Sequence, residues 1–221
     1  KILNIDNGDE RLKELEQKLS EANANCKEVA GRLTATRRKA ATTVERGMKD
    51  RLVPLGIPKV RFSISIEPRE FQRDGCDAVA FLFSANSSSD MMPISQVASG
   101  GEIARVMLSL KAMISNAVKL PTIIFDEIDT GVSGKIAEKM ALIMQEMAQS
   151  ERQVISITHL PQIAARGTTH YKVYKEETEN GTESTMTRLN DEQRVNEIAQ
   201  MLSGSDITDA AKHNAKDLLG A

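Results

Sequence analysis

Pro121 is followed by the stretch Thr122-Ile123-Ile124-Phe125-Asp126-Glu127, a short apolar run that ends on two adjacent carboxylates. A run of this length and composition is typical of a buried parallel strand. Helical apolar spacing precedes it over 103–118 and follows it over 136–148, and a second apolar run, Val154-Ile155-Ser156-Ile157, comes next. Helix, strand, helix and strand with short connections predict an α/β sheet covered on both faces.

A long β-hairpin is predicted upstream of this unit, within 52–85. Apolar residues alternate there with polar ones, which is the period of a half-buried strand. The apolar positions are Val60, Phe62, Ile64 and Ile66. Arg73-Asp74-Gly75 supplies turn residues, and the more continuously apolar segment 78–83 follows as the second strand.

The C-terminal part predicts a second hairpin and a helical ending. Segments 171–175 and 184–189 have strand character and are joined through Asn180-Gly181, so we expect a hairpin at the edge of the sheet. From about Glu192 the pattern is helical, with an interruption at Ser203-Gly204-Ser205.

The N-terminal part, from about residue 9 to 48, contains no proline and has the spacing of a long helix. Its apolar positions are Leu12, Leu15, Leu19, Ala22, Cys26, Val29 and Leu33. Steps of three and four place these residues on a narrow seam suited to another helix. Two interpretations stand: an amphipathic helix packed on its own domain, or one strand of an antiparallel coiled coil whose partner lies outside or upstream of this chain. We predict a coiled-coil segment over 1–50 and a globular lobe over 51–221.

Composition excludes several classes of protein. The 221 residues include 29 basic and 31 acidic side chains, so bulk charge gives no support to a protein that coats nucleic acid. The 2 cysteines, Cys26 and Cys76, are too few for a disulfide framework and fit a reducing cytosol. No apolar run approaches the ~20 residues that cross a bilayer, and the N-terminus has no signal-peptide core. We expect a cytoplasmic protein without a membrane partner and, because the chain opens without Met, a piece of something longer.

Charge is uneven along the predicted rod. Between residues 27 and 51 there are eight basic and three acidic side chains. Such a run is usually a solvated helix face. The alternative is a surface that contacts phosphates where the rod meets the globular part.

Three places carry candidate chemistry, and each also has an ordinary structural explanation. Ser99-Gly100-Gly101-Glu102 precedes a helix and suits an anion at a helix N-terminus, or is simply an N-cap. Asp126-Glu127, with Asp129 close by, could hold Mg²⁺ and orient a water, or is a solvated strand end. His159 ends the second apolar run and could touch a terminal phosphate, although a lone histidine is more often structural.

Together these motifs resemble ABC-type ATPase heads. The stretch 97–102 matches the signature motif, 122–127 the Walker B strand, and His159 the switch histidine. A rod ahead of the signature motif resembles the SMC-like branch of these ATPases. The fold implied is α/β: the C-terminal lobe of an ABC/SMC-type P-loop ATPase head, with an N-terminal coiled-coil helix.

Four ordered segments narrow the resemblance to the bacterial DNA-repair family RecN. These segments are Phe81-Leu82-Phe83-Ser84-Ala85-Asn86, Val97-Ala98-Ser99-Gly100-Gly101-Glu102, Phe125-Asp126-Glu127-Ile128-Asp129-Thr130-Gly131-Val132-Ser133-Gly134 and Thr158-His159-Leu160-Pro161-Gln162. The resemblance extends through His170-Tyr171 and the tail at 215–219, and so covers essentially everything from about residue 50 onward.

The resemblance implies an ATPase that uses ATP and Mg²⁺ between two dimerised heads and acts on DNA in recombinational double-strand-break repair. Glu127 would be the general base, His159 would sense the γ-phosphate, and Asp126 would help to hold Mg²⁺. The signature residues expected to bind nucleotide across the head–head interface are Ser99, Gly100, Gly101 and Glu102. The implied partners are the N-terminal Walker A half of the same protein, a second head and DNA, in the bacterial cytoplasm at the nucleoid.

The phosphate-binding P-loop itself is missing from the sequence. The only Gly-Lys pair is Gly134-Lys135, where Asp129 stands in place of the first glycine and Ile136 in place of the hydroxyl residue. We therefore expect this chain to be the C-terminal half of a head and inactive alone. Ser133 also replaces the Asp that ABC heads usually carry after Walker B, a form that RecN sequences share. The alternatives are another SMC-like DNA-bridging ATPase or a non-enzymatic coiled-coil scaffold.

Overall fold

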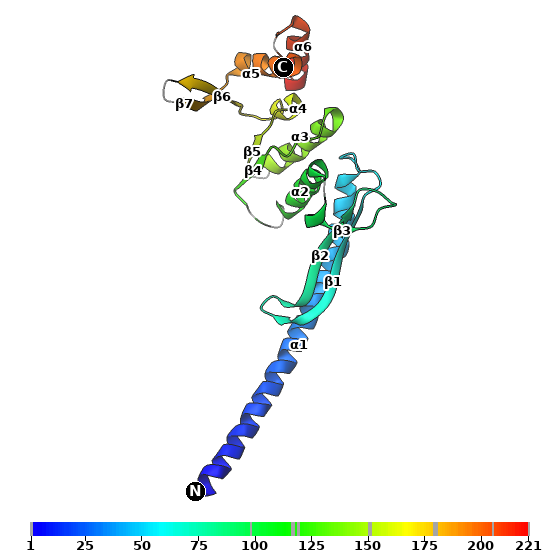
Figure 1. Cartoon of the computed structure of the whole chain (residues 1–221), viewed down its shortest axis with the longest axis vertical. Helices are drawn as coiled ribbons and strands as arrows, with labels where there is room; N and C mark the ends of the chain where they lie inside the picture. Colours follow the sequence, from blue (N-terminus) through cyan, green and yellow to red (C-terminus); the bar gives the residue numbers. More distant parts are fainter. Residues whose placement is uncertain are drawn as a thin grey trace.

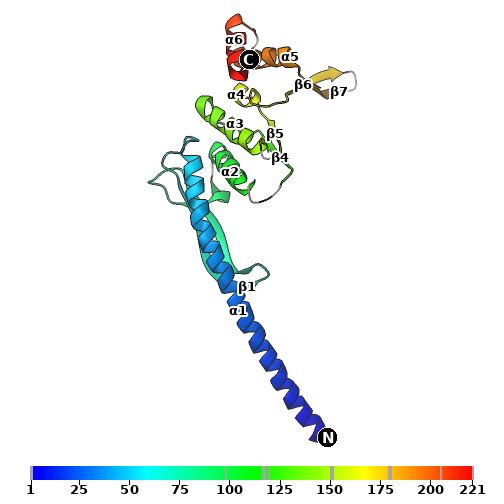
Figure 2. The same cartoon turned by 180° about the vertical axis from the view of Figure 1, so that it is seen from behind.

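The computed structural model describes residues 2–97, 99–115, 118, 120–149, 152–178, 181–204 and 206–220. One long helix projects from a group of smaller elements gathered at its C-terminal end (Figure 1). The view from behind shows the same arrangement, with the N-terminus at the free end of the helix (Figure 2). The α/β class predicted from the sequence is confirmed.

The long helix is α1 (Ile2–Leu52). The predicted helix is therefore confirmed, and it extends beyond both expected ends. Its first half is bare: Leu12, Leu15 and Leu19 are 56%, 49% and 63% exposed. Its second half packs on the lobe and buries Met48 and Leu52 completely. The second half therefore packs on its own domain, as the first interpretation predicts, and the first half leaves its apolar seam exposed. In the described part of the chain, no helix combines the length and the hydropathy needed to cross a membrane.

The first hairpin consists of β1 (Arg61–Gln72) and β2 (Gly75–Ser84), which pair antiparallel, and the short β3 (Met92–Pro93) adds to β2. This confirms the upstream hairpin. A 3₁₀ turn, η1 (Ile94–Gln96), follows β3. Apolar side chains from α1, from both hairpin strands and from α2 (Gly100–Ser115) share one buried cluster. Its fully or nearly buried members are Met48, Leu52, Ile57, Val60, Phe83 and Val106.

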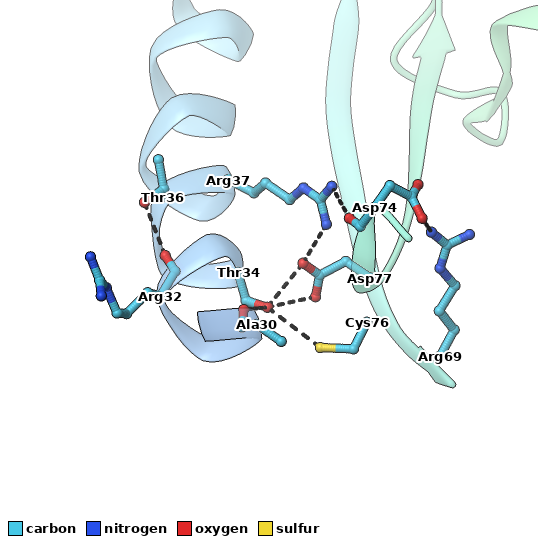
Figure 3. Close-up of polar contacts among 9 residues, drawn as sticks. All are labelled: Ala30, Arg32, Thr34, Thr36, Arg37, Arg69, Asp74, Cys76 and Asp77. Atoms are coloured by element: carbon cyan, nitrogen blue, oxygen red, sulfur yellow. Dashed lines mark hydrogen bonds and ion pairs between the residues drawn. The ribbon is translucent and has the colours of Figure 1, made fainter. Parts of the chain in front are cut away.

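Polar contacts fasten the hairpin to the second half of α1 (Figure 3). The Thr34 hydroxyl and the Arg37 guanidinium donate to the carboxylate of Asp77 at 2.8 and 2.9 Å, and Arg37 also reaches the carbonyl of Asp74 at 2.7 Å. The Arg37 guanidinium, with a smaller contribution from Thr34, holds the pKa of Asp77 below its usual value. Further along, a Glu45 carboxylate oxygen accepts from the backbone N–H of Ile64 at 2.7 Å. These contacts fix the hairpin along the rod.

The central unit is β4 (Thr122–Asp126), α3 (Gly134–Ala148) and β5 (Gln153–Ile157), with the two strands parallel. Ile123 and Phe125, 4% and 1% exposed, pack with the α3 methionines and with Leu108 of α2. On the opposite face Ile124, 58% exposed, lies beside Ile155, 40% exposed. The expectation of a sheet covered on both faces is therefore wrong for the described residues, because α2 and α3 pack on one face only.

Beyond β5 the chain forms α4 (Pro161–Ala164) and a hairpin of β6 (Tyr171–Thr178) and β7 (Gly181–Arg188). The hairpin is present as expected, but its placement was wrong: it makes a separate two-stranded sheet rather than an edge of β4–β5. Asn180 of the expected turn lies outside the described residues. The helical ending is confirmed as α5 (Asp191–Ser203) and α6 (Asp209–Leu219). Ile198 of α5 and Ala215 of α6 are buried in one cluster. Ser205 of the expected interruption lies outside the described residues.

Candidate nucleotide site

Asp126 and Glu127 lie at the C-terminal end of β4 and are both exposed. The backbone N–H of Glu127 donates to the carbonyl of Ile157 at 3.1 Å, which continues the pairing of β4 with β5. Glu127 also has φ +45°, and it is the only non-glycine residue in the described ranges with a positive φ. That left-handed backbone is costly for a residue with a side chain, and such outliers gather at functional sites. The two carboxylates are open to a ligand.

A tight turn follows Glu127 and buries the next acidic residue. The Thr130 hydroxyl donates to the carbonyl of Glu127 at 3.0 Å, and the Val132 N–H donates to the carbonyl of Asp129 at 3.1 Å. Asp129 is only 1% exposed. Three acidic residues close in sequence therefore have different environments, two facing solvent and one sealed in the turn.

The end of β5 meets this turn. Thr158 donates its hydroxyl to one oxygen of Asp129, and the same hydroxyl accepts from the Leu160 N–H at 3.0 Å. His159 is 65% exposed, with Nδ1 3.6 Å from the other oxygen of Asp129. The structure thus brings the predicted Walker B and switch-histidine segments together. Thr158 was not among the predicted site residues, and Asp129 was predicted only as an additional acid. The position of Thr158 at the end of the adjacent parallel strand was a usable signal.

The start of α2 behaves as a capped helix N-terminus. The Ser99 hydroxyl accepts from the Glu102 N–H at 3.4 Å, and the Ser99 carbonyl accepts from Ile103 at 3.0 Å. The ordinary N-cap explanation of this motif therefore describes what Ser99 does here, while the open N–H groups of the first turn still suit an anion. Within the described residues, 99–102 form no hydrogen bond or ion pair with Asp126, Glu127 or His159.

The two glycines of this motif have different surroundings. A Cβ on Gly100 would meet nothing within 4 Å, whereas a Cβ on Gly101 would lie 3.0 Å from the carbonyl oxygen of Thr130. The absence of a side chain at Gly101 therefore lets the start of α2 approach the turn after β4. Through this contact the predicted signature segment lies beside the turn that follows the predicted Walker B strand.

This difference predicts that alanine destabilises the chain at Gly101 and does not at Gly100. Gly101→Ala should lower the free energy of unfolding by about 1 kcal/mol, because its methyl group crowds a backbone carbonyl that cannot move freely. Gly100→Ala is the matched control and should leave stability unchanged or raise it by up to about 1 kcal/mol, since alanine is the better helix former. Urea unfolding followed by circular dichroism measures both. A Gly101→Ala chain more stable than the Gly100→Ala chain would contradict the close approach.

A cavity of about 160 Å³ opens beside the start of α2. Glu102, Arg105, Lys59 and Asn86 line it together with four neighbouring residues. Neither carboxylate of 126–127 lines this cavity, and neither does His159. Glu102 therefore lies at the edge of a small basic pocket.

The residues at the end of β4 fit a metal that is shared with phosphates. No three His, Cys, Asp or Glu side chains among the described residues gather into a metal cage. Mg²⁺ in nucleotide enzymes commonly takes one or two carboxylates and completes its shell with phosphate oxygens and water. The exposed Asp126 at the carboxyl end of a parallel strand suits that arrangement, and the open backbone at Gly100 suits an anion.

Solved structures of SMC heads share this fold. The SMC head domain with a coiled coil and joint from Pyrococcus yayanosii superposes with a TM-score of 0.58 at 20% identity, over 76% of this chain and 30% of that one. A second structure comes from work on ATP-driven dimerization and DNA stimulated activation of SMC ATPases. It superposes with a TM-score of 0.53 at 18% identity, over 78% of this chain and 99% of that one. The fold is that of the C-terminal lobe of an ABC/SMC-type head with its coiled-coil helix.

Sequence relatives are more specific. No family model matches the chain. The DNA repair protein RecN of Halalkalibacterium halodurans is 36% identical over 216 residues, which are 96% of this chain and 38% of the relative. RecN of Haemophilus influenzae is 33% identical over 99% of this chain and 39% of the relative. The chain thus spans about two fifths of the length of these relatives and matches their C-terminal portion. It belongs to the RecN family of DNA repair proteins.

Proposed function

We propose that this chain supplies the signature, Walker B and switch-histidine half of a RecN head that binds and hydrolyses ATP and acts on DNA in recombinational double-strand-break repair. The observation that carries the proposal is the exposed pair Asp126–Glu127, which leaves β4 through a left-handed backbone beside the His159 end of β5.

The chemistry assigned to these residues is phosphoryl transfer to water. Bound Mg²⁺ would neutralise charge on the ATP phosphates. Asp126 would share in holding that ion, Glu127 would orient and deprotonate the attacking water, and His159 would contact the terminal phosphate. Catalysis of this kind depends on positioning and charge stabilisation from several sides, so half a site is expected to be nearly inert.

The other half of the head is expected from the part of RecN that precedes this portion. Parallel strands are normally covered on both faces, and the bare face at Ile124, Ile155 and Ile157 leaves room for a lobe that carries the missing Walker A motif. The bare leucine seam of α1 likewise suits a second helix of the same protein, as an antiparallel coiled coil over 1–50 ahead of the head lobe over 51–221.

A second head and DNA complete the proposal. Ser99, Gly100, Gly101 and Glu102 would approach the ATP held by the opposite head, in line with the ATP-driven dimerization described for the SMC ATPase of similar fold. For DNA, the basic run over 27–51 is the candidate surface. Arg37 is occupied by Asp77, and no ion pair is formed by the other basic side chains of that run, all of which belong to the described residues. We place this work in the bacterial cytoplasm, at the nucleoid.

Light scattering on a complete RecN protein that contains this chain tests the proposal. The protein should shift towards a head dimer when ATP and Mg²⁺ are added, and the 221-residue chain alone should not respond to ATP. ADP is the matched control. Association of the complete protein that is unaffected by ATP would contradict the proposal and favour a coiled-coil scaffold.

A further inference from the structure

Asp129 has one oxygen with a partner and one without. Its side chain is 1% exposed, and Thr158 donates its hydroxyl to Oδ2. Oδ1 is also buried and has no hydrogen bond within the described part of the chain. A buried carboxylate oxygen is rarely left unpaired, because the lost hydration is not replaced. Some donor is therefore needed at this position.

His159 Nδ1 is the donor at hand. It lies 3.6 Å from Asp129 Oδ1, slightly beyond hydrogen-bonding range. The imidazole is 65% exposed, so few contacts oppose the small rotation that closes this gap. Thr158 cannot serve Oδ1 instead, because its hydroxyl hydrogen is directed to Oδ2 while its oxygen accepts from Leu160.

We propose that Asp129 is a positioning residue for His159: it accepts a hydrogen bond from Nδ1–H and so fixes both the ring plane and the tautomer. A histidine held in this way presents Nε2 as its free nitrogen. The contact would also hold the end of β5 against the turn after β4, so that the positions of His159 and Glu127 relative to each other stay constant. Its part in turnover rests on the proposed ATPase function, but the contact itself does not.

Nuclear magnetic resonance of the imidazole nitrogens tests the contact without any nucleotide. The chain has 3 histidines, so His159→Gln assigns the signals of His159. At a pH where the imidazoles are neutral, two-bond ¹H–¹⁵N correlations should show His159 mainly as the Nδ1–H tautomer. Exposed imidazoles in water favour Nε2–H, and that tautomer at His159 in the unaltered chain would overturn the proposal.

Asp129→Asn sharpens the test. Thr158 still needs an acceptor, so the new amide oxygen should stay on its hydroxyl and the amide NH₂ should face Nδ1. The tautomer of His159 should then change to Nε2–H. Asp217→Asn is the matched control, because Asp217 lies 3.8 Å from His213 on the exposed surface of α6. That substitution should leave His159 unchanged. A His159 tautomer that is the same in the unaltered chain and in the Asp129→Asn variant would contradict the contact.

Turnover separates this inference from the proposed function. In complete RecN, Asp129→Asn should lower kcat about tenfold with little change in KM, less than the loss of the acid–base group itself. Wild-type turnover with a changed tautomer would overturn the positioning role. A complete RecN that hydrolyses no ATP would refute the proposed function, while the tautomer would still decide whether Asp129 holds His159.

Discussion

Complete RecN carrying Glu127→Gln should hydrolyse ATP at least about 100-fold more slowly than the unaltered protein. Glutamine keeps the size and hydrogen-bonding reach of the side chain but cannot take a proton from water. Because Glu127 is exposed at the end of β4 and buries nothing, folding and ATP binding should be unaffected. ATP should therefore still join the heads, and dimers with ATP bound should accumulate. Phosphate release measures turnover, and light scattering measures the dimers.

The matched control for this variant is Glu146→Gln. Glu146 is an exposed carboxylate on α3, away from the end of β4, and its side chain forms none of the hydrogen bonds or ion pairs of the described residues. Its replacement should leave turnover unchanged. Unchanged turnover in Glu127→Gln would reject Glu127 as the residue that activates water.

Phe125→Ala should lower the free energy of unfolding of the isolated chain by about 3–5 kcal/mol. The ring is 1% exposed, packs within the α2–α3 cluster, and has the Lys111 ammonium 5.9 Å from its centroid. Truncation to alanine leaves a cavity that rigid neighbours on two helices cannot fill. Urea unfolding followed by circular dichroism gives the difference.

Ile124→Ala is the control for this large effect and tests the bare face of the sheet. Ile124 is adjacent in sequence but 58% exposed, so its truncation should cost under about 1 kcal/mol in the isolated chain. In complete RecN the same change should cost about 2–5 kcal/mol, because the upstream lobe is expected to cover this face. Equal losses for Phe125 and Ile124 in the isolated chain would contradict packing on one face only.

Much of the fold could be predicted because its signals are local. The heptad-like leucines predicted α1, and the alternation around Phe62 predicted the first hairpin. The apolar run that ends at Asp126 correctly predicted β4. Its apolar residues point to both faces of the sheet, so the sequence could not show that, among the described residues, helices pack on only one face. The placement of the β6–β7 hairpin was wrong for a related reason: strand character gives no information about which sheet a strand joins.

The candidate site was predictable in its segments and not in its contacts. Asp126 and Asp129 look alike in sequence, and only the turn that begins at the left-handed Glu127 exposes one and buries the other. Outside the site, at the other end of the two strands, Arg152 gave no signal at all, although its guanidinium donates to the carbonyls of Ser115, Leu120 and Met147. Such residues depend on partners from several segments, which no periodic pattern records.

Mixing two inactive variants of complete RecN tests most directly whether this chain contributes to two separate nucleotide sites. Ser99→Arg should block the signature surface, and Glu127→Gln should stop hydrolysis, so each protein alone should be nearly inactive. In a mixed dimer one site combines the intact signature of one head with the intact Glu127 of the other. An equal mixture that is combined before ATP is added should therefore regain up to about a quarter of normal turnover, because at random pairing half of the dimers are mixed and each has one working site. A mixture no more active than either variant alone would contradict the account.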